Sequence, residues 1–176
     1  AEALARFESE GVDLVLSDHD MPRLDGLGLL RAVQRIREGP FILYSAGAAN
    51  EVVTIGAGNK LVLGQRGGIF NATGATTLRQ LIVGSSTSQG GILTAGDGVN
   101  PAEITLSSLP IGGTATSITI NSSIQDNPGA GADKSVVSLT VMGGYVTLAG
   151  ANTHTGGTYI VSGRVSQPNV NSFGTG

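Results

Sequence analysis

Three carboxylates at close spacing, Asp18, Asp20 and Asp25, are the first groups in the chain whose type and position could support chemistry. The first two follow a short, nearly continuous apolar run at residues 12–16, which is typical of a strand buried on both faces of a parallel sheet. In open α/β sheets, ligands bind at the carboxyl ends of such strands. A calcium loop of the EF-hand type is excluded, because Pro22 interrupts the spacing and the Gly and Glu of that loop are missing.

The other reactive residue types are scarce. The chain has no cysteine, which excludes disulfides, cysteine-based zinc sites and a cysteine nucleophile. Its two histidines, His19 and His154, are too few for most histidine-based metal sites, and no His–Asp set stands near a serine. His154 lies in a turn-rich stretch, where we expect an exposed side chain. We therefore expect no catalytic residues, no metal site and no enzymatic activity.

Ordinary α/β elements would position Asp18. Residues 3–10 have the apolar spacing of an amphipathic helix, and Asp25 is a suitable N-cap for a second helix. A second buried strand is expected at 41–44, and it ends in Ser45. The second helix would bury one stripe and expose a basic side, with Leu27, Leu29, Leu30, Val33 and Ile36 in the stripe and Arg31, Arg35 and Arg37 in water.

The stretch DLVLSDHDMPRLDGLGLLRAVQRIREGPFILYSAG resembles the receiver domain of two-component response regulators, and the resemblance covers residues 1–53. It implies that Asp18 is the phosphoacceptor and that Ser45 supplies the hydroxyl that contacts the phosphoryl group. Mg²⁺ would then be the cofactor, and only if this receiver segment functions. The match covers the middle of a truncated receiver. Lys60, the nearest candidate for the lysine of a receiver, lies in a stretch that we interpret as a hairpin.

Composition changes sharply near residue 50. Residues 1–50 hold 13 charged side chains and 5 glycines, whereas residues 51–176 hold 10 charged side chains and 23 glycines. We therefore expect two segments of different class, a partial α/β segment at 1–50 and an all-β segment at 51–176. The net charge of −3 provides no basic field for nucleic acid, and no apolar run is long enough to span a membrane.

Short apolar stretches separated by Gly and Asn turns fill residues 51–176. Strands are expected at 52–55, 60–63, 78–83, 91–94, 103–106, 116–120, 136–141, 145–148 and 158–161. A β-sandwich could use such strands, but scarce aromatics and corners rich in Asn and Thr favour a parallel β-helix. The sequons at 71–73 and 121–123 are expected in exposed loops, and residues 129–133 in a turn.

The stretch LTVMGGYVTLAGANTHTGGTYIVSGRV, residues 139–165, resembles the autotransporter-associated β-strand repeat. The resemblance implies that residues 51–176 belong to an autotransporter passenger, a rigid bacterial stalk displayed at the cell surface without catalysis. Its partner would be a host surface or another extracellular ligand. His154 stands where that repeat usually has an aromatic residue.

Together these patterns predict a mainly β fold, a parallel β-helix (solenoid) preceded by a partial receiver-like α/β fragment. The expected function is structural: surface display, with adhesion as one use. The alternative is a two-component signalling receiver that uses Asp18, incomplete in this chain. A secreted carbohydrate enzyme is disfavoured, because the five acids of residues 51–176 are widely spaced.

The two resemblances imply different compartments, the cell surface or exterior for the passenger and the cytoplasm for the receiver. We therefore expect a chimeric or fragmentary sequence joined between about residues 46 and 55. An open end of the β-helix would favour edge-to-edge self-association, and residues 1–50 could cap such an end.

Overall fold

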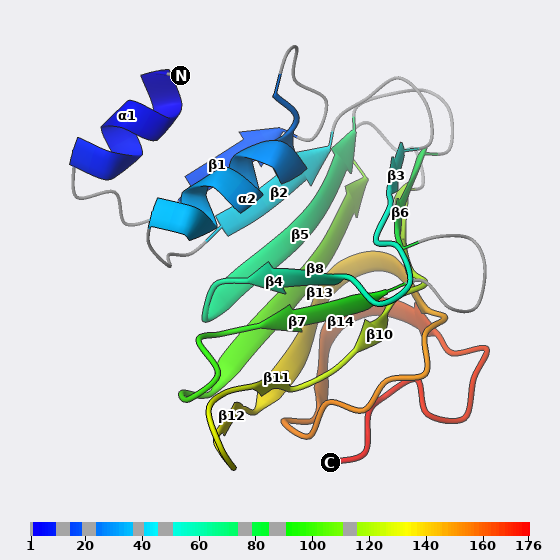
Figure 1. Ribbon diagram of the computed structural model, residues 1–176. Coiled ribbons are helices and arrows are strands. Elements are labelled where there is room, and N and C mark those ends of the chain that lie inside the picture. Colours follow the sequence, from blue (N-terminus) through cyan, green and yellow to red (C-terminus); the bar gives the residue numbers. More distant parts are fainter. Residues whose placement is uncertain are drawn as a thin grey trace.

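The computed structural model describes residues 2–9, 15–18, 24–36, 41–45, 51–73, 79–84, 91–110 and 116–176. Over these residues the chain is mainly β, as predicted, and its strands form a curled, largely parallel sheet (Figure 1). Two helices lie at the N-terminal end of this sheet (Figure 1). They are α1 (Glu2–Ser9) and α2 (Gly26–Ile36).

The helix α2 connects two parallel strands, β1 (Val15–Asp18) and β2 (Phe41–Ser45), and packs against both. Its start is capped as predicted, because the backbone N–H of Gly28 donates a hydrogen bond of 2.6 Å to Asp25 Oδ1. Leu30 and Val33 are buried. Ile36 is 38% exposed, so the predicted apolar stripe is wrong at its last position, where the helix ends.

The large sheet runs from β1 and β2 into the glycine-rich segment. Its order is β1-β2-β5-β8-β13-β9-β6-β3, with β14 paired to β13, and every pairing in it is parallel. The strands beyond β2 are β3 (Glu51–Val53), β5 (Arg66–Thr73), β6 (Arg79–Val83), β8 (Ala102–Pro110), β9 (Thr116–Ile120), β13 (Val137–Leu148) and β14 (Thr158–Ser166).

The strand β13 belongs to both halves of this sheet. Its first part pairs with β8 and its last part with β9. Its register with β14 shifts between Met142 and Tyr145, where the strand bends. The bend lies at Gly143 and Gly144, which have φ values of 96° and 71° that glycine adopts without strain. The two strands predicted at 136–141 and 145–148 are therefore one bent strand.

A second, smaller sheet has the order β10-β7-β4, and it is also parallel. Its strands are β4 (Lys60–Leu63), β7 (Ile92–Ala95) and β10 (Ser123–Ile124). Among the described residues, only β11 (Asn127–Pro128) and β12 (Lys134–Ser135) pair antiparallel. An antiparallel sandwich is thus wrong, and so is the hairpin expected around Lys60, whose strand pairs parallel with β7.

The core lies between the first part of the large sheet (β5, β8 and the start of β13), its second part (β6, β9 and the end of β13) and the small sheet. It is built mainly from aliphatic side chains that are partners in the strand register. On β5, β8 and β13 the partners Ile69, Leu106 and Val141 form one such row. Two further rows are Leu81, Ile118 and Val146, and Leu61, Leu93 and Ile124. Each row stacks aliphatic side chains of similar size across neighbouring strands. The aromatic side chain in the described core is Phe7, which lies on α1.

Sequence patterns located most strands but missed β5. The segments 60–63 and 116–120 are strands with the predicted bounds. The strand β5 contains two glycines and an asparagine, which read as turn residues. Asn71 is buried within it and donates a hydrogen bond of 2.7 Å to the backbone oxygen of Ser117, so the exposed loop expected at its sequon is wrong.

Candidate functional site

The predicted phosphoacceptor and hydroxyl lie at the same edge of the sheet. In the register of β1 and β2, Asp18 is the Cα partner of Tyr44, and Ser45 follows directly. The two residues therefore stand at the carboxyl ends of neighbouring parallel strands, where ligands of α/β sheets bind. Their side chains, like His19 and Asp20, lie outside the described part of the chain. The adjacent position on the other side of Ser45 is Asn71 of β5.

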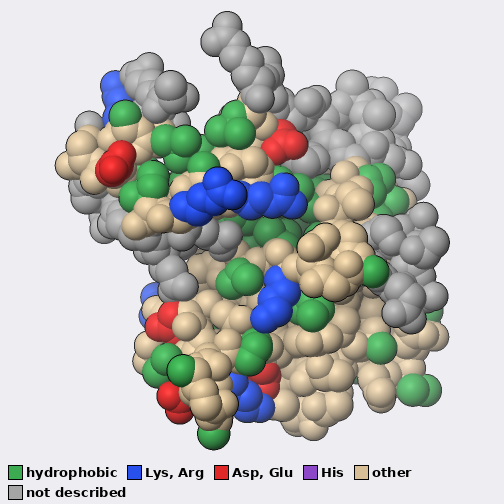
Figure 2. Space-filling view, in the orientation of Figure 1, with side chains coloured by type: hydrophobic (Ala, Val, Ile, Leu, Met, Phe, Trp, Pro, Cys, Tyr) green, Lys and Arg blue, Asp and Glu red, His purple; other side chains and the backbone are tan. Residues whose placement is uncertain are grey.

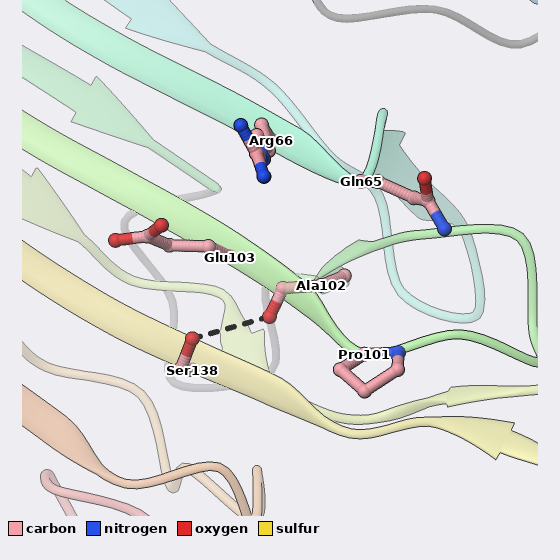
Figure 3. Close-up of a pocket in the computed structure, with 6 residues that line it drawn as sticks. All are labelled: Gln65, Arg66, Pro101, Ala102, Glu103 and Ser138. Atoms are coloured by element: carbon pink, nitrogen blue, oxygen red, sulfur yellow. Dashed lines mark hydrogen bonds between the residues drawn. The ribbon is translucent and has the colours of Figure 1, made fainter.

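A small open cleft lies where β5, β8 and β13 begin, and its volume is about 280 Å³. Gln65, Arg66, Pro101, Ala102, Glu103 and Ser138 line it (Figure 3). Figure 3 shows that the Gln65 and Glu103 side chains point in different directions, and the bond drawn joins Ser138 Oγ to the Ala102 oxygen at 3.2 Å. Ligand pockets usually enclose about 300–1,000 Å³ and present converging polar groups. The volume of this cleft is at the lower limit of that range, and its polar side chains do not converge.

Asp126, between β10 and β11, is a carboxylate with four hydrogen bonds. It accepts hydrogen bonds from Lys134 Nζ at 2.7 Å, from the Val137 N–H at 3.0 Å and from both the N–H and Oγ1 of Thr155 at 2.9 and 2.7 Å. Partial burial acts to raise the pKa of Asp126, but these hydrogen bonds outweigh it and lower the pKa to about 2. Asp126 thereby ties together three segments that are distant in sequence.

His154 lies beside Asp126 and is fully buried, with 0% exposure, so the expected exposed side chain is wrong. Its Nε2 is 3.0 Å from Thr158 Oγ1, and its Nδ1 has no hydrogen-bond partner among the described residues. Burial lowers the pKa of His154 below its ordinary value and outweighs the opposing effects of the Asp126 charge and of a backbone contact with Ile124.

A segment at the end of the chain, residues 169–176, is held across the last strands, and we call it the C-terminal strap. Its Ser172 Oγ donates to the Leu148 oxygen at 2.9 Å, and its Asn169 side chain donates to the Ala149 oxygen. From the other side, the Asn152 Nδ2 donates to the Ser172 oxygen at 2.5 Å. Asn152 Oδ1 in turn accepts the Ile124 N–H at 2.8 Å, so one buried amide joins three successive layers.

Asp97 organises a turn between β7 and β8. Its carboxylate accepts the N–H groups of Asn100 and Val99 at 2.8 and 2.9 Å and the Asn100 Nδ2 at 2.7 Å. The Asn100 and Val99 bonds lower the pKa of Asp97 to about 2. An aspartate that bonds to N–H groups two and three positions ahead is a common turn former, so the sequence Gly-Asp-Gly-Val-Asn could have indicated this role.

The edge strand β14 is the most exposed apolar element described. It pairs with β13 along its length, and no described strand lies on its other side. Ile160 is the Cα partner of the fully buried Val141, yet it is 49% exposed, and Tyr159 and Val161 beside it are exposed as well. The face seen in Figure 2 differs from this apolar edge. Lys and Arg side chains form a row over α2 there, and much of the surface below that row is uncharged.

Asp18 and Ser45 stay the site residues predicted from the sequence, whereas the sequence did not indicate the polar groups that the structure brings together. Asp126, Asn152 and His154 meet through the stacking of segments about 28 residues apart, and no local spacing signals such a meeting. The described residues contain no group of three His, Asp or Glu side chains placed to hold a metal ion. No helix in the described ranges is long and apolar enough to cross a membrane.

Comparisons with known proteins found no match among protein-family models, curated proteins or solved structures.

Proposed function

We propose that residues 51–176 are a β-helical structural segment, a non-catalytic stalk displayed at a cell surface as a spacer or adhesive element. The carrying observation is the order in which strands recur. Three successive strands lie in the first part of the large sheet, in its second part and in the small sheet, in that order. This order occurs in β5-β6-β7 and again in β8-β9-β10 (Figure 1). Each strand of the second set pairs parallel with its counterpart in the first, as successive coils of a solenoid do.

The register supports this winding. Ile69, Leu106 and Val141 are partners at steps of 37 and 35 residues, and Leu61, Leu93 and Ile124 are partners at steps of 32 and 31. In a solenoid each coil adds a similar number of residues, so partners on different faces are expected to be separated by similar numbers of residues. The step then falls to 19 residues between Leu139 and Thr158, within the stretch that resembles the autotransporter repeat.

The polar groups support a structural role. Residue types that often act in catalysis are engaged here in bonds between or within coils: Asp126 holds Thr155 and Val137, His154 is enclosed beside Thr158, and Asp97 shapes a turn. Such bonds satisfy buried backbone groups at the corners and so stabilise the stack. A host surface or an extracellular ligand is the proposed partner of this stalk.

A second candidate is phosphoryl signalling, favoured by the common sheet edge of Asp18 and Ser45. A phosphorylated aspartate there would act through Mg²⁺ and the nearby hydroxyl. In a complete receiver, the strand beside β2 would come from the receiver itself, whereas here it is β5 from the glycine-rich segment. We therefore rank this role below the structural one and propose that residues 1–50 cap the first coil.

The two functions predict different compartments, and amine labelling separates them. Lys60 is exposed, so a membrane-impermeant amine reagent should modify it on intact cells that carry the gene if the segment is displayed. A Lys60→Arg variant controls for labelling elsewhere, because arginine does not react. Modification of Lys60 only after the cells are permeabilised would contradict surface display and favour the signalling role.

A further inference from the structure

The ring of His154 lies in an enclosed environment and has one hydrogen-bonding contact. Its Nε2 is 3.0 Å from Thr158 Oγ1, which also lies 3.1 Å from the Phe173 oxygen. Its other nitrogen, Nδ1, is buried with no hydrogen-bond partner among the described residues. In the charged ring both nitrogens are donors, and Nδ1 would then be a buried donor that has only the Ile124 backbone contact to offset its burial.

The C-terminal strap is packed directly on this ring. A Cβ on Gly174 would lie 2.8 Å from Cε1 and 2.9 Å from Nε2 of His154, so the bare glycine backbone covers the imidazole closely. The Thr175 N–H donates to the His154 oxygen at 3.1 Å, and the Asn152 N–H donates to the Asn171 oxygen at the same distance. The strap and the ring thus hold each other in place.

Few charges face this ring. Asp126 and Lys134 lie on the β10–β12 side, paired with each other at 2.7 Å. On the opposite side, residues 169–176 contain no titratable side chain, and Thr158 is the group contributed by β14. The Ile124 corner contributes a carbonyl, which accepts the backbone N–H of His154 at 3.2 Å. Asp126 favours a charged imidazole, but burial opposes the charge more strongly.

We propose that His154 is an acid-sensitive latch, whose protonation releases the C-terminal strap from the end of the stack while the other strands stay folded. This inference stands on the corner geometry and does not depend on the proposed structural function. Release would uncover the Leu148 and Ala149 oxygens and the Asn152 side chain, which the strap now covers.

The pH range follows from the two states of the ring. With the strap attached, the pKa of His154 is lowered; with the strap released, water reaches the ring and the pKa returns to about 6.5. Attachment is therefore constant above about pH 6.5 and weakens as the pH falls below it, by at most about tenfold per pH unit. Asp126, with a pKa of about 2, stays ionised throughout and is not the titrating group.

Amide hydrogen exchange of the full chain tests the latch. We expect the protection of the Thr175 and Asn152 amides, corrected for intrinsic exchange, to fall about tenfold or more between pH 7.5 and 5.0. The Leu106 amide in β8 should keep its protection. In a His154→Phe variant, which keeps an aromatic ring but cannot titrate, strap protection should not depend on pH. A wild type without the drop, or a variant with the same drop, would overturn the proposal.

An NMR titration of the wild type covers the case in which the phenylalanine variant fails to fold. The His154 Cε1 proton should titrate below about pH 6.5, together with the loss of Thr175 protection. A midpoint at or above 6.5 would overturn the latch. An Asp126→Asn variant should move the midpoint to lower pH, because it removes the charge that favours the imidazolium, and an unchanged or higher midpoint would count against the arrangement.

Discussion

Single glycines at the corners decide how closely neighbouring strands stack. Gly144 has a φ of 71°, and a Cβ on it would overlap the backbone oxygen of Ser108. The same corner recurs on β14, where a Cβ on Gly163 would lie 2.6 Å from the Gly144 oxygen. The backbones at this corner are therefore in contact, and side chains larger than hydrogen do not fit between them.

A pair of glycine substitutions separates this close approach from backbone strain. Gly131 has a φ of 66°, similar to that of Gly144, but no atom lies within 4 Å of its Cβ position. Gly131→Ala should lower the free energy of unfolding by about 1 kcal/mol, which is the strain of the left-handed conformation alone. Gly144→Ala should lower the free energy of unfolding by about 3 kcal/mol or more in chemical denaturation, because a clash adds to the strain. Equal losses for the two variants would show that the corner is not close-packed.

The polar residues show what single-residue reasoning could and could not reach. Asp25 was predictable as an N-cap, since its partner Gly28 lies three positions away. His154 and Asn71 were predicted to be exposed, because turn-rich sequence and sequons are typical of loops. Each is instead buried by a segment that is distant in sequence. The residues next to it in the sequence do not indicate which distant segment will cover it.

At the scale of elements, α2 packs on β1 and β2 at the first edge of the large sheet, and we call these three elements the cap. Leu30 is 1% exposed and faces the interior of this cap, whereas Ile36 at the end of the same helix is 38% exposed. The β2–β5 pairing joins the cap to the glycine-rich segment. The α/β segment and the all-β segment are thus continuous in hydrogen bonding.

Truncating these two aliphatic residues tests the cap. Leu30→Ala should lower the free energy of unfolding of the cap by about 2–4 kcal/mol, through lost burial and the cavity left behind. Ile36→Ala, the matched control, should cost less than about 1 kcal/mol because its side chain is already partly in water. Hydrogen exchange of the α2 amides reports both. A Leu30 variant no less protected than the Ile36 variant would contradict the packing of α2.

Element prediction succeeded where periodicity is local. The alternation in residues 60–63 and 116–120 identified β4 and β9 with their bounds, since each strand turns its aliphatic residues to one side. The strand β5 escaped because Gly67 and Gly68 read as a turn, although Gly67 lies against Leu63 in the packed interior. Likewise, Gly143 and Gly144 bend a strand that they were expected to end.

At the scale of the whole molecule, the pairing of strands was the least predictable feature. Partners such as Thr105 and Thr140 are 35 residues apart, and a similar strand pattern also suits a sandwich. Scarce aromatics and corners rich in Asn and Thr favoured parallel coils, and parallel pairing is what most of the described strands have. The proposed solenoid rests on this pairing.

Thiol crosslinking tests the stacked coils most directly, since the chain has no cysteine of its own. Thr105 pairs with Thr140, and Thr119 pairs with Thr147, on two different parts of the sheet. Neighbouring strands are about 4.8 Å apart, so each pair, replaced by cysteines, should be bridged rapidly by a short crosslinker such as dibromobimane.

The same four positions supply the control. In the swapped pairs, Thr105 with Thr147 and Thr119 with Thr140, the residues are separated by about seven strand positions, more than about 10 Å even across the bend in β13. We expect intramolecular bridging of both matched pairs and of neither swapped pair, measured by mass spectrometry of the full chain. Swapped pairs that bridge as readily as the matched ones, or matched pairs that do not bridge, would contradict the stacked coils.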